Sequence, residues 1–206
     1  ETFNLYSYKH PGTTANGGVG LTGTTGTFAA KFTTTTAAKI SAVNLAFFAT
    51  SATTYKVAIY PDSAGTPGLV PLYVDASNRT VTVTAPIAIT LPSPVAVGPG
   101  TFYVGIQQTN TTNANLSFDN ETPIRTGAFF LATPNPPTAW FDFAPANNFK
   151  LNIGVTLVQC ATAAGCNDNN PCTDDACTNL LCVHTNNSVT SCDGNSCSNP
   201  DQCVNG

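Results

Sequence analysis

The sequence predicts an all-β protein, a jelly-roll-like β-sandwich joined to a small, loop-dominated, disulfide-rich module at its C-terminal end. The first observation is a series of short segments in which apolar and polar residues alternate, separated by breaks rich in Pro and Gly. The second is composition, because only 9% of the residues are charged and 33 are Thr, a β-branched residue that favours strands. The third is that all eight cysteines lie between Cys160 and Cys203. The long front part can therefore bury an apolar core, whereas the short cysteine-rich part needs covalent crosslinks.

The N-terminal residues predict a strand followed by a tether. Residues 1–8, ETFNLYSY, place Phe3 and Leu5 on one face of a short strand. The Gly- and Thr-rich residues that follow are typical of a flexible linker, so residues 1–26 form the first predicted segment. Such a strand can pair with its own sheet, or it can be donated to the open edge of a neighbouring copy. The second arrangement predicts a homopolymer with Phe3 and Leu5 as donor-strand residues, because each contact is head-to-tail and does not close.

Residues 27–158 carry the patterns that predict the β-sandwich. The clearest strand is 149–158, where apolar residues occupy alternate positions over the whole segment. Residues 101–109 and 55–59 repeat this alternation, and 79–84 sets Val81 and Val83 against an outward row of Thr. Roughly eight to ten strands at this spacing indicate a sandwich without a long helix. Further strands are expected at 28–33, 38–49, 69–74, 86–91, 126–132 and 138–143.

Residues 159–206 form the predicted disulfide-rich, acidic module. The spacing C-x5-C-x5-C-x4-C-x4-C-x9-C-x4-C-x5-C is quasi-regular, whereas structural zinc sites favour two close pairs of ligands. Four disulfides are therefore expected, and the sequence does not choose among the roughly one hundred pairings open to eight cysteines. Disulfides persist outside the reducing cytosol, which predicts a secreted, extracellular or cell-surface protein. The predicted disulfide cysteines are Cys160, Cys166, Cys172, Cys177, Cys182, Cys192, Cys197 and Cys203.

Oxygen-bearing side chains recur at fixed intervals inside this module and predict calcium as a cofactor. Oxygen ligands on alternate residues of a turn can wrap a hard cation, and the module has five Asp but no basic residue to oppose them. The alternative is that these side chains hydrogen-bond their own backbone in tight turns, and the sequence leaves both interpretations open. The predicted ligands, in two sets at i, i+2 and i+6, are Asp168, Asn170, Asp174, Asp193, Asn195 and Asn199.

Two stretches of the chain resemble known kinds of extracellular module. The run KFTTTTAAKISAVNLAFFATSATTYKVAIYPDSAGTPG, leading to PVAVGPGTFYVGIQQT, resembles the sandwich modules common in secreted multidomain bacterial proteins. The run CNDNNPCTDDACTNLLCVHTNNSVTSCDGNSC is similar to the C-x-D-x-N-x-C-T-x-D-x-C repeats of bacterial and slime-mould extracellular proteins. Its second copy departs from that pattern, with Ser198 and Asn199 where Thr and Asp are usual. The resemblance implies an extracellular spacer or adhesive module and no catalyst.

Several classes of function find no support in the sequence. The seven Lys and Arg are scattered ahead of Cys160, so no basic patch predicts a nucleic-acid partner. No apolar run reaches the roughly 18 residues that a membrane span requires. The two histidines, His10 and His184, belong to no recognisable catalytic motif, so neither a catalytic residue nor an enzyme activity is predicted. The start at Glu1 and the lack of Met fit a mature secreted product and equally a piece of a longer chain.

N-glycosylation sequons accompany the extracellular prediction. They place the modified loops at the solvent-facing surface, provided that the host has the machinery. The sequon residues are Asn78, Asn110, Asn115, Asn120 and Asn186.

Two functions follow from these observations. The first is an extracellular structural protein, a subunit of a filament or surface adhesive layer that polymerises by donating its N-terminal strand. The second is a carbohydrate-binding accessory module of a larger secreted protein, with surface polysaccharide as the partner. Aromatic side chains would supply the sugar platform, although a single Trp in an alternating strand is also typical of a core. The candidate platform residues are Trp140, Phe141, Tyr73 and Tyr103.

Overall fold

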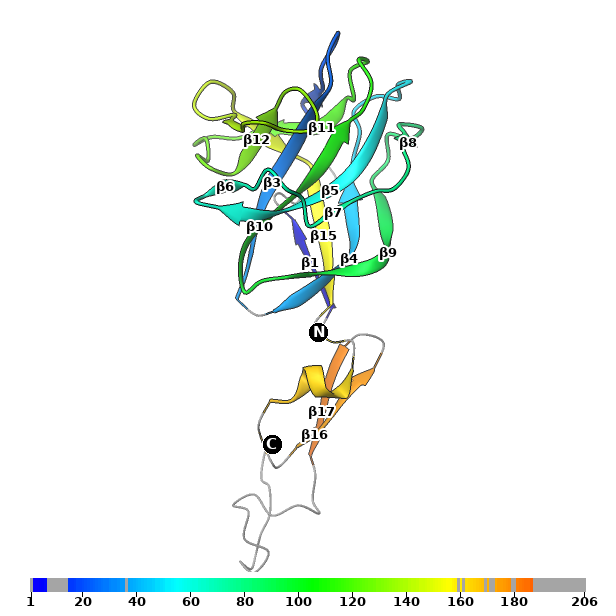
Figure 1. Cartoon of the computed structure of the whole chain (residues 1–206), viewed down its shortest axis with the longest axis vertical. Coiled ribbons are helices and arrows are strands. Elements are labelled where there is room, and N and C mark those ends of the chain that lie inside the picture. Colours follow the sequence, from blue (N-terminus) through cyan, green and yellow to red (C-terminus); the bar gives the residue numbers. More distant parts are fainter. Residues whose placement is uncertain are drawn as a thin grey trace, which may run out of the picture. The chain divides into compact units, whose positions relative to one another are not determined.

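The chain divides into two compact units, one of residues 4–156 and one of residues 1–3 with 157–206. The computed structural model describes residues 2–6, 15–35, 37–158, 160, 162–168, 170, 173–178 and 181–186. Figure 1 shows that nearly all of the regular structure is strand. The described residues contain one 3₁₀ turn, η1 (Ala163–Cys166), and no α-helix, which confirms the all-β prediction. Among these residues, no helix has the length and apolar character needed to cross a membrane.

The sandwich strands are mostly short and are joined by turns. They are β1 (Thr2–Tyr6), β2 (Gly17–Val19), β3 (Gly26–Thr34), β4 (Ala38–Leu45), β5 (Thr54–Ser63), β6 (Thr66–Pro67), β7 (Tyr73–Val74), β8 (Arg79–Thr80), β9 (Ile87–Val97), β10 (Gly100–Gln108), β11 (Leu116–Asn120), β12 (Phe129–Ala132), β13 (Phe141–Asp142), β14 (Phe149–Leu151) and β15 (Ile153–Val158).

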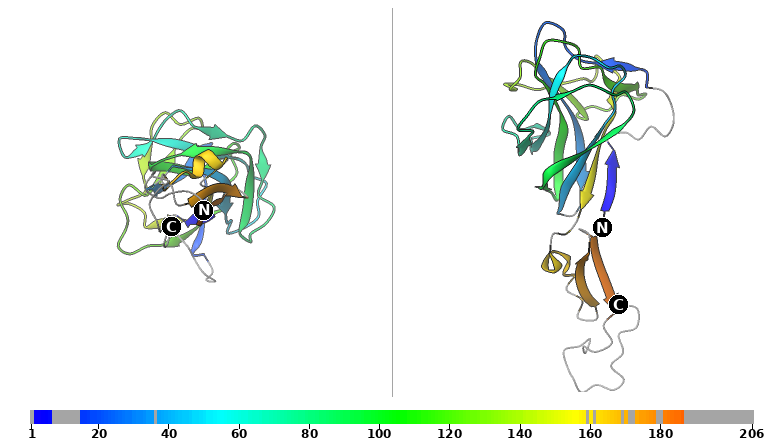
Figure 2. Two further views of the ribbon diagram at one scale, coloured as in Figure 1. Left: turned by 90° about the horizontal axis from the view of Figure 1, so that it is seen from below. Right: turned by 90° about the vertical axis from the view of Figure 1, so that its right-hand side faces the viewer.

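These strands form two layers. One layer is the large sheet, in the order β13-β12-β3-β10-β5, with β6, β7 and β8 all pairing with β5 at its far edge. The other layer holds a four-stranded sheet, β1-β15-β4-β9, and a three-stranded sheet, β14-β11-β2. The side view in Figure 2 shows the large sheet on one side of the sandwich and the yellow β15 on the other. The predicted β-sandwich is therefore confirmed as the fold of this part of the chain.

The N-terminal strand β1 lies at an edge of the four-stranded sheet, next to β15 of the same chain. This is the intramolecular arrangement of the two that the sequence allows, and donation to another copy stays a prediction. The side chains of Phe3 and Leu5 lie outside the described residues. Within the segment predicted as a tether, β2 pairs with β11 and sets Val19 opposite Leu116.

Apolar side chains from both layers meet in a core between them. Phe28 and Ile59 of the large sheet and Ile40 and Leu151 of the opposite layer are completely buried. Because successive side chains of a strand point to opposite faces, β3 and β10 send every second residue into this core. β10 also runs so close to β3 that a Cβ atom at Gly105 would overlap the Phe28 carbonyl oxygen.

Some predicted strands differ from the observed ones because of how the strands pair. Residues 149–158 form two strands with a break at Asn152, since β14 joins the three-stranded sheet and β15 the four-stranded one. The predicted inward position of Val83 is wrong, because the chain leaves the edge of β5 after β8 and Val81, and Val83 is 41% exposed. β2 and β11 are not among the predicted strands.

The cysteine-rich unit consists of η1 followed by a hairpin of β16 (Thr173–Thr178) and β17 (Leu181–Asn186). Two disulfides fasten the hairpin to the preceding segment, Cys160–Cys177 and Cys166–Cys182. Cys160 and Cys166 are almost fully buried, so the crosslinks form much of the small interior of this unit. The other four predicted disulfide cysteines, Cys172, Cys192, Cys197 and Cys203, lie outside the described residues.

Candidate functional site

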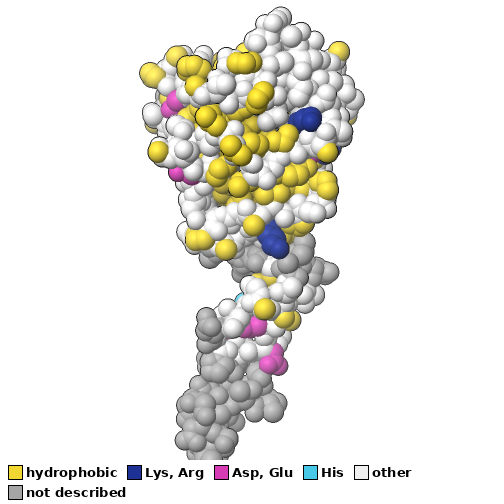
Figure 3. All heavy atoms as spheres, viewed as in Figure 1, with side chains coloured by type: hydrophobic (Ala, Val, Ile, Leu, Met, Phe, Trp, Pro, Cys, Tyr) yellow, Lys and Arg dark blue, Asp and Glu magenta, His cyan; other side chains and the backbone are white. Residues whose placement is uncertain are grey.

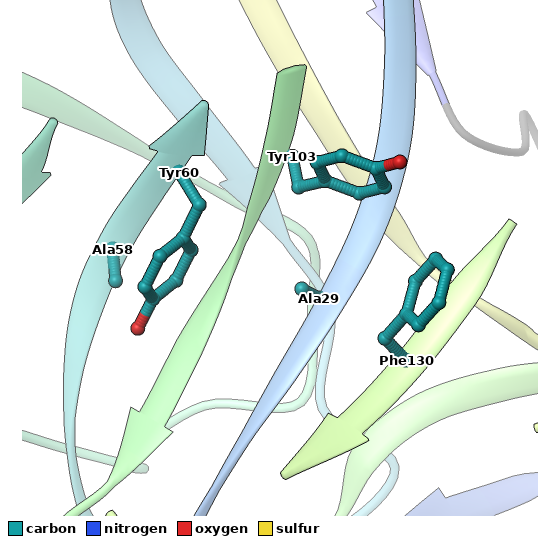
Figure 4. Packing of buried hydrophobic residues seen from close by; sticks show 5 residues of the cluster. All are labelled: Ala29, Ala58, Tyr60, Tyr103 and Phe130. Atoms are coloured by element: carbon teal, nitrogen blue, oxygen red, sulfur yellow. The ribbon is translucent and has the colours of Figure 1, made fainter. Parts of the chain in front are cut away.

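The large sheet carries apolar side chains on its outer face as well as on the face that packs into the sandwich core. We call the outer cluster the aromatic face, formed by Ala29, Ala58, Tyr60, Tyr103 and Phe130. None of these residues is more than 2% exposed. Figure 4 shows that they come from four neighbouring strands, β3, β5, β10 and β12. An outward sheet face is usually polar, so an aromatic cluster on it requires a separate explanation.

The register of the strands shapes this face. Gly105 of β10 stands opposite Ala29 of β3 and Ala58 of β5, which makes a row of small residues across three strands. Two pairs further along the ladder, and so on the same face, Tyr103 stands opposite Tyr60. The Tyr103 ring meets Phe130 edge-on at 5.5 Å between centroids. On this face a row of small residues therefore lies beside a row of rings.

Two side chains cover the aromatic face from outside, Trp140 and Val74. Trp140 is half-buried and meets Tyr60 edge-to-face, with 5.2 Å between ring centroids and 79° between planes. It ends the segment 133–140, which connects β12 to β13 and which we call the strap. The Trp140 indole Nε1 is buried and has no hydrogen-bond partner among the described residues. Buried donors normally have an acceptor, and this atom is an exception to that rule among the described residues.

A chain of hydrogen bonds ties the strap to the sheet. The Gln107 Nε2 donates to the Tyr60 hydroxyl at 2.8 Å. Asn135 of the strap donates to the Gln107 Oε1 at 3.5 Å and accepts from the Thr27 hydroxyl at 3.3 Å. Burial raises the pKa of the Tyr60 phenol, so the ring stays neutral at physiological pH.

A shallow depression of about 240 Å³ is lined by residues of β5, β9 and β10 and by Leu72, none of which belongs to the aromatic face. Asp62, which is exposed, lies in its wall and accepts a hydrogen bond from the Tyr103 hydroxyl at 2.9 Å. Burial, with a further contribution from Asp62, raises the pKa of Tyr103 above its usual value. Residues lining the depression include Pro61, Asp62, Leu72, Val97, Thr101 and Phe102.

At the far edge of β5, the Asp75 carboxylate accepts a backbone hydrogen bond that a neighbouring strand would otherwise accept. This carboxylate accepts the Val57 amide at 3.0 Å, the Tyr73 hydroxyl at 2.7 Å and the Arg79 guanidinium at 2.6 Å. Burial by itself would raise the pKa of Asp75, but these three donors together hold it below its usual value. Burial and the Asp75 carboxylate also raise the pKa of Tyr73 to about 12. This cluster fixes β7 and β8 against β5.

The aromatic residues proposed as sugar platforms from the sequence occupy different surroundings. The interpretation of Tyr103 as a surface platform is wrong, because its ring is completely buried in the aromatic face. Tyr73 is half-buried and engaged with Asp75. Phe141 is 60% exposed, but its ladder partner is Leu131, so it projects from the face opposite to that of Phe130. Trp140 is the platform candidate that reaches the aromatic face from solvent.

The surface around this region is broad and mostly uncharged. Figure 3 looks onto the side of the sandwich that carries β5, β6 and β7, where hydrophobic side chains gather and charged ones are few. The connection from β6 to β7 contributes Leu69, Val70 and Leu72, which are 50%, 78% and 50% exposed. Exposed apolar clusters of this kind are typical of binding surfaces.

In the cysteine-rich unit the structure gathers Asp168, Asp175 and His184, whose ligand atoms lie within 4.8 Å of one another. The His184 Nδ1 lies 2.7 Å from Asp175 Oδ1 and 3.5 Å from Asp168 Oδ2. Asp168 also accepts the Asn170 amide at 2.8 Å, which is the local turn bonding that the sequence leaves open. This hydrogen bond from the Asn170 backbone amide is the main reason why the pKa of Asp168 lies below its usual value.

The calcium ligands predicted from the sequence only partly coincide with this cluster. Asp174 is not a member, because alternation along β16 places it on the face opposite to Asp175. The second predicted set, Asp193, Asn195 and Asn199, lies outside the described residues. Calcium binding therefore stays a prediction, with Asp175 and His184 as residues that the sequence pattern missed.

The sequons also differ in their surroundings. Asn78 and Asn120 are exposed, as a glycosylated residue must be. Asn110 donates its side-chain amide to the Ala52 carbonyl, and its Oδ1 is buried. Asn115 is half-buried with a φ of 55°. The side chain of Asn186 lies outside the described residues, as does His10.

Neither a family model nor a curated protein matches this sequence. The solved structures that resemble it include two of the clostridial protein Cwp84. One comprises the cysteine protease and lectin-like domains of Cwp84, a surface-layer-associated protein of Clostridium difficile, with a TM-score of 0.47 and 18% identity over 65% of this chain. The other is a variant of the cysteine protease Cwp84 after propeptide cleavage, with a TM-score of 0.53 and 15% identity over 76% of this chain. The chain spans 32% and 40% of their lengths. At 15% identity, the likeness to the second structure indicates a shared fold only.

Proposed function

We propose that this chain is a secreted carbohydrate-binding module that attaches to surface polysaccharide through the exposed side of Trp140, which packs against the aromatic face. The observation that carries the proposal is the surplus of apolar side chains on the outer face of the large sheet. Tyr60, Tyr103 and Phe130 are at most 2% exposed, so the ring of this cluster that a ligand can reach is Trp140, which packs against them. Trp140 then presents an indole at the solvent side of this cluster.

Several properties of this region suit a sugar. The apolar face of a pyranose ring packs on an aromatic ring, and its hydroxyls need nearby hydrogen-bonding groups. Asn135 of the strap and Asp62 of β5 are polar side chains of this side that are not fully buried. The disulfides of the second unit support an extracellular location, because they persist in oxidising compartments. The lectin-like domains named for Cwp84 belong to that protein, and the proposal does not depend on them.

Trp140 and Phe141 are adjacent in sequence but lie on opposite faces, so variants of the two residues test whether Trp140 binds the polysaccharide. We expect Trp140→Ala to weaken binding to an immobilised polysaccharide at least about tenfold, or about 1.4 kcal/mol. Phe141→Ala removes a more exposed ring from the opposite face and is expected to leave the affinity unchanged. Affinity electrophoresis of both variants measures this, and Trp140→Phe with a thermal melt controls for lost packing against Tyr60. Loss of binding in Phe141→Ala but not in Trp140→Ala would overturn the assignment.

A filament subunit is the second candidate, and the edge position of β1 favours it. β1 pairs only with β15 among the described strands, so it can be exchanged between copies without disturbing the centre of a sheet. Deletion of residues 1–8 tests this exchange. A folded but strictly monomeric product, from a parent that forms filaments under the electron microscope, supports it. A parent that is monodisperse at every concentration contradicts it.

A further inference from the structure

We infer that the sandwich forms an intramolecular isopeptide bond between the side chains of Lys150 and Asp119. Lys150 belongs to β14 and Asp119 to β11, and the two residues stand directly opposite each other in the antiparallel ladder. The side chains of such a pair lie on the same face of the sheet, with their Cβ atoms about 4.5–5.5 Å apart. The lysine amine is therefore within reach of the aspartate carboxyl group.

This arrangement distinguishes Lys150 from the other lysines that the structure describes. All of them lie in strands, but only Lys150 stands opposite a carboxylate in its ladder. The other three stand opposite uncharged residues, in the pairs Lys31–Tyr103, Lys39–Ala96 and Lys56–Gln107. The cysteines all lie from Cys160 onward, so an amide between β11 and β14 would give the sandwich a crosslink that disulfides do not supply.

The pair lies where water has little access to the carboxyl group. Asp119 is only 2% exposed, and both of its carboxylate oxygens are shielded from solvent. Lys150 is half-buried. An ammonium and a carboxylate lose hydration in such a place, whereas an amide carries no charge. Because condensation releases a water molecule, a site that excludes water also protects the amide from hydrolysis.

Glu121 supplies a group that can move the proton. It follows Asp119 on the same side of the chain, and its backbone amide donates to the Asn148 carbonyl at 2.9 Å, which continues the ladder past the end of β11. Glu121 and Lys150 are therefore diagonal neighbours, a separation that long side chains span. One carboxylate oxygen of Glu121 pairs with Arg125. The other, Oε2, is buried and has no hydrogen-bond partner among the described residues.

The condensation needs no reagent from outside the protein. The Glu121 carboxylate takes a proton from the Lys150 ammonium, and the resulting amine attacks the Asp119 carboxyl carbon. A C–N bond forms and a C–O bond breaks. The oxygen leaves as water, with the proton carried by Glu121 and a second proton from the nitrogen. The ammonium and the carboxylate thus become an amide and one water molecule, no atom is oxidised or reduced, and Glu121 returns to its starting form.

The mass of the full chain tests the crosslink directly. We expect the protein, after reduction of its disulfides, to be lighter than its sequence mass by one water molecule. Trypsin does not cut after an acylated lysine, so residues 80–125 and 126–206 should appear as one branched peptide joined through Asp119 and Lys150. An unchanged sequence mass overturns the inference. Loss of water with separate tryptic peptides, as from cyclisation of Glu1, overturns it as well, and loss of ammonia would assign the bond to an asparagine and refute the role of Asp119.

Matched variants locate the bond and the proton carrier. Lys150→Arg keeps the positive charge but cannot form the amide, so it should regain the full sequence mass. Lys39→Arg is the control and should keep the loss of water, because Lys39 stands opposite Ala96. Glu121→Gln should have the full mass while circular dichroism shows it folded. A Lys150→Arg protein that is still lighter by one water refutes the inference, and a Glu121→Gln protein crosslinked as fully as its parent refutes the role of Glu121.

Discussion

Cys177 and Cys182 stand directly opposite each other in the β16–β17 ladder, yet each forms a disulfide with a different cysteine of the preceding segment. Cys177 joins Cys160 and Cys182 joins Cys166, so both strands of the hairpin are fastened to the segment around η1. A direct Cys177–Cys182 bond would only close a short turn. The observed pairing restrains the whole unit, which has few apolar residues with which to hold itself together.

Removal of one of these disulfides should destabilise the cysteine-rich unit. Replacing Cys166 and Cys182 together by Ser opens a loop with a sequence separation of 16, which corresponds to about 3 kcal/mol in the chain-entropy estimate. Calorimetry of the full chain measures the loss, and peptide mapping without reduction measures the pairing. A Cys177–Cys182 or Cys160–Cys166 disulfide in the native protein would contradict this arrangement.

The Asp75 carboxylate should make the sandwich sensitive to acid. Because its pKa in the folded protein lies below the ordinary 3.8, the carboxylate stabilises the fold above that pH and loses this contribution as the pH falls through its folded pKa. Asp75→Asn should cost about 2 kcal/mol near neutral pH, the range for a hydrogen bond to a charged group. Urea unfolding from about pH 7 to pH 3 should show the difference between variant and parent shrinking at the acidic end. Asp62→Asn, which alters an exposed carboxylate, is the control and should cost less than about 1 kcal/mol. A difference that is constant across the whole pH range refutes the assignment.

Gly105 should be among the least replaceable residues of the sandwich. A methyl group in Gly105→Ala overlaps the backbone carbonyl of Phe28, and backbone cannot move aside as a flexible side chain can. We expect a loss of more than about 3 kcal/mol, or no folded product. Gly165→Ala is the control, because a Cβ atom there comes only within 3.9 Å of Cys160. Circular dichroism and thermal melts distinguish the two, and a Gly105→Ala protein as stable as its parent would show that β10 does not approach β3 this closely.

Period-two alternation was sufficient to predict the sandwich, because strands such as β10 bury alternate residues in the inner core whatever their partners. It could not predict the aromatic face. The outward residues Tyr103 and Gln107 of β10 have the spacing of solvent-facing positions, yet both are buried, and Trp140 covers the aromatic face from outside. That cover depends on Trp140 reaching Tyr60, a contact between residues 80 positions apart that no local pattern encodes.

The cluster of Asp168, Asp175 and His184 could not be predicted from a local sequence pattern either. The interval of Asp168, Asn170 and Asp174 correctly pointed to a turn, but it gave no weight to strand alternation. Once residues 173–178 form β16, Asp174 and Asp175 face opposite ways, and Asp175 joins Asp168. His184 belongs to β17 and lies directly opposite Asp175 in the ladder. Its proximity to the two carboxylates therefore follows only from the register of the hairpin.

Variants of the neighbouring residues Asp174 and Asp175 can test whether the cysteine-rich unit binds a divalent cation. We expect a chelator to lower the melting temperature of the unit and added cation to restore it. Calcium takes oxygen ligands, whereas an imidazole with two carboxylates also suits zinc, so both ions are added separately. Asp175→Asn should abolish the response to the chelator if the ion lies between Asp168 and His184. Asp174→Asn should leave the response intact for that site, and it should abolish the response instead if the ligand set predicted from the sequence is the correct one. Identical melts in calcium, in zinc and in chelator would mean that Asp168 serves only the turn, through its hydrogen bond from the Asn170 amide.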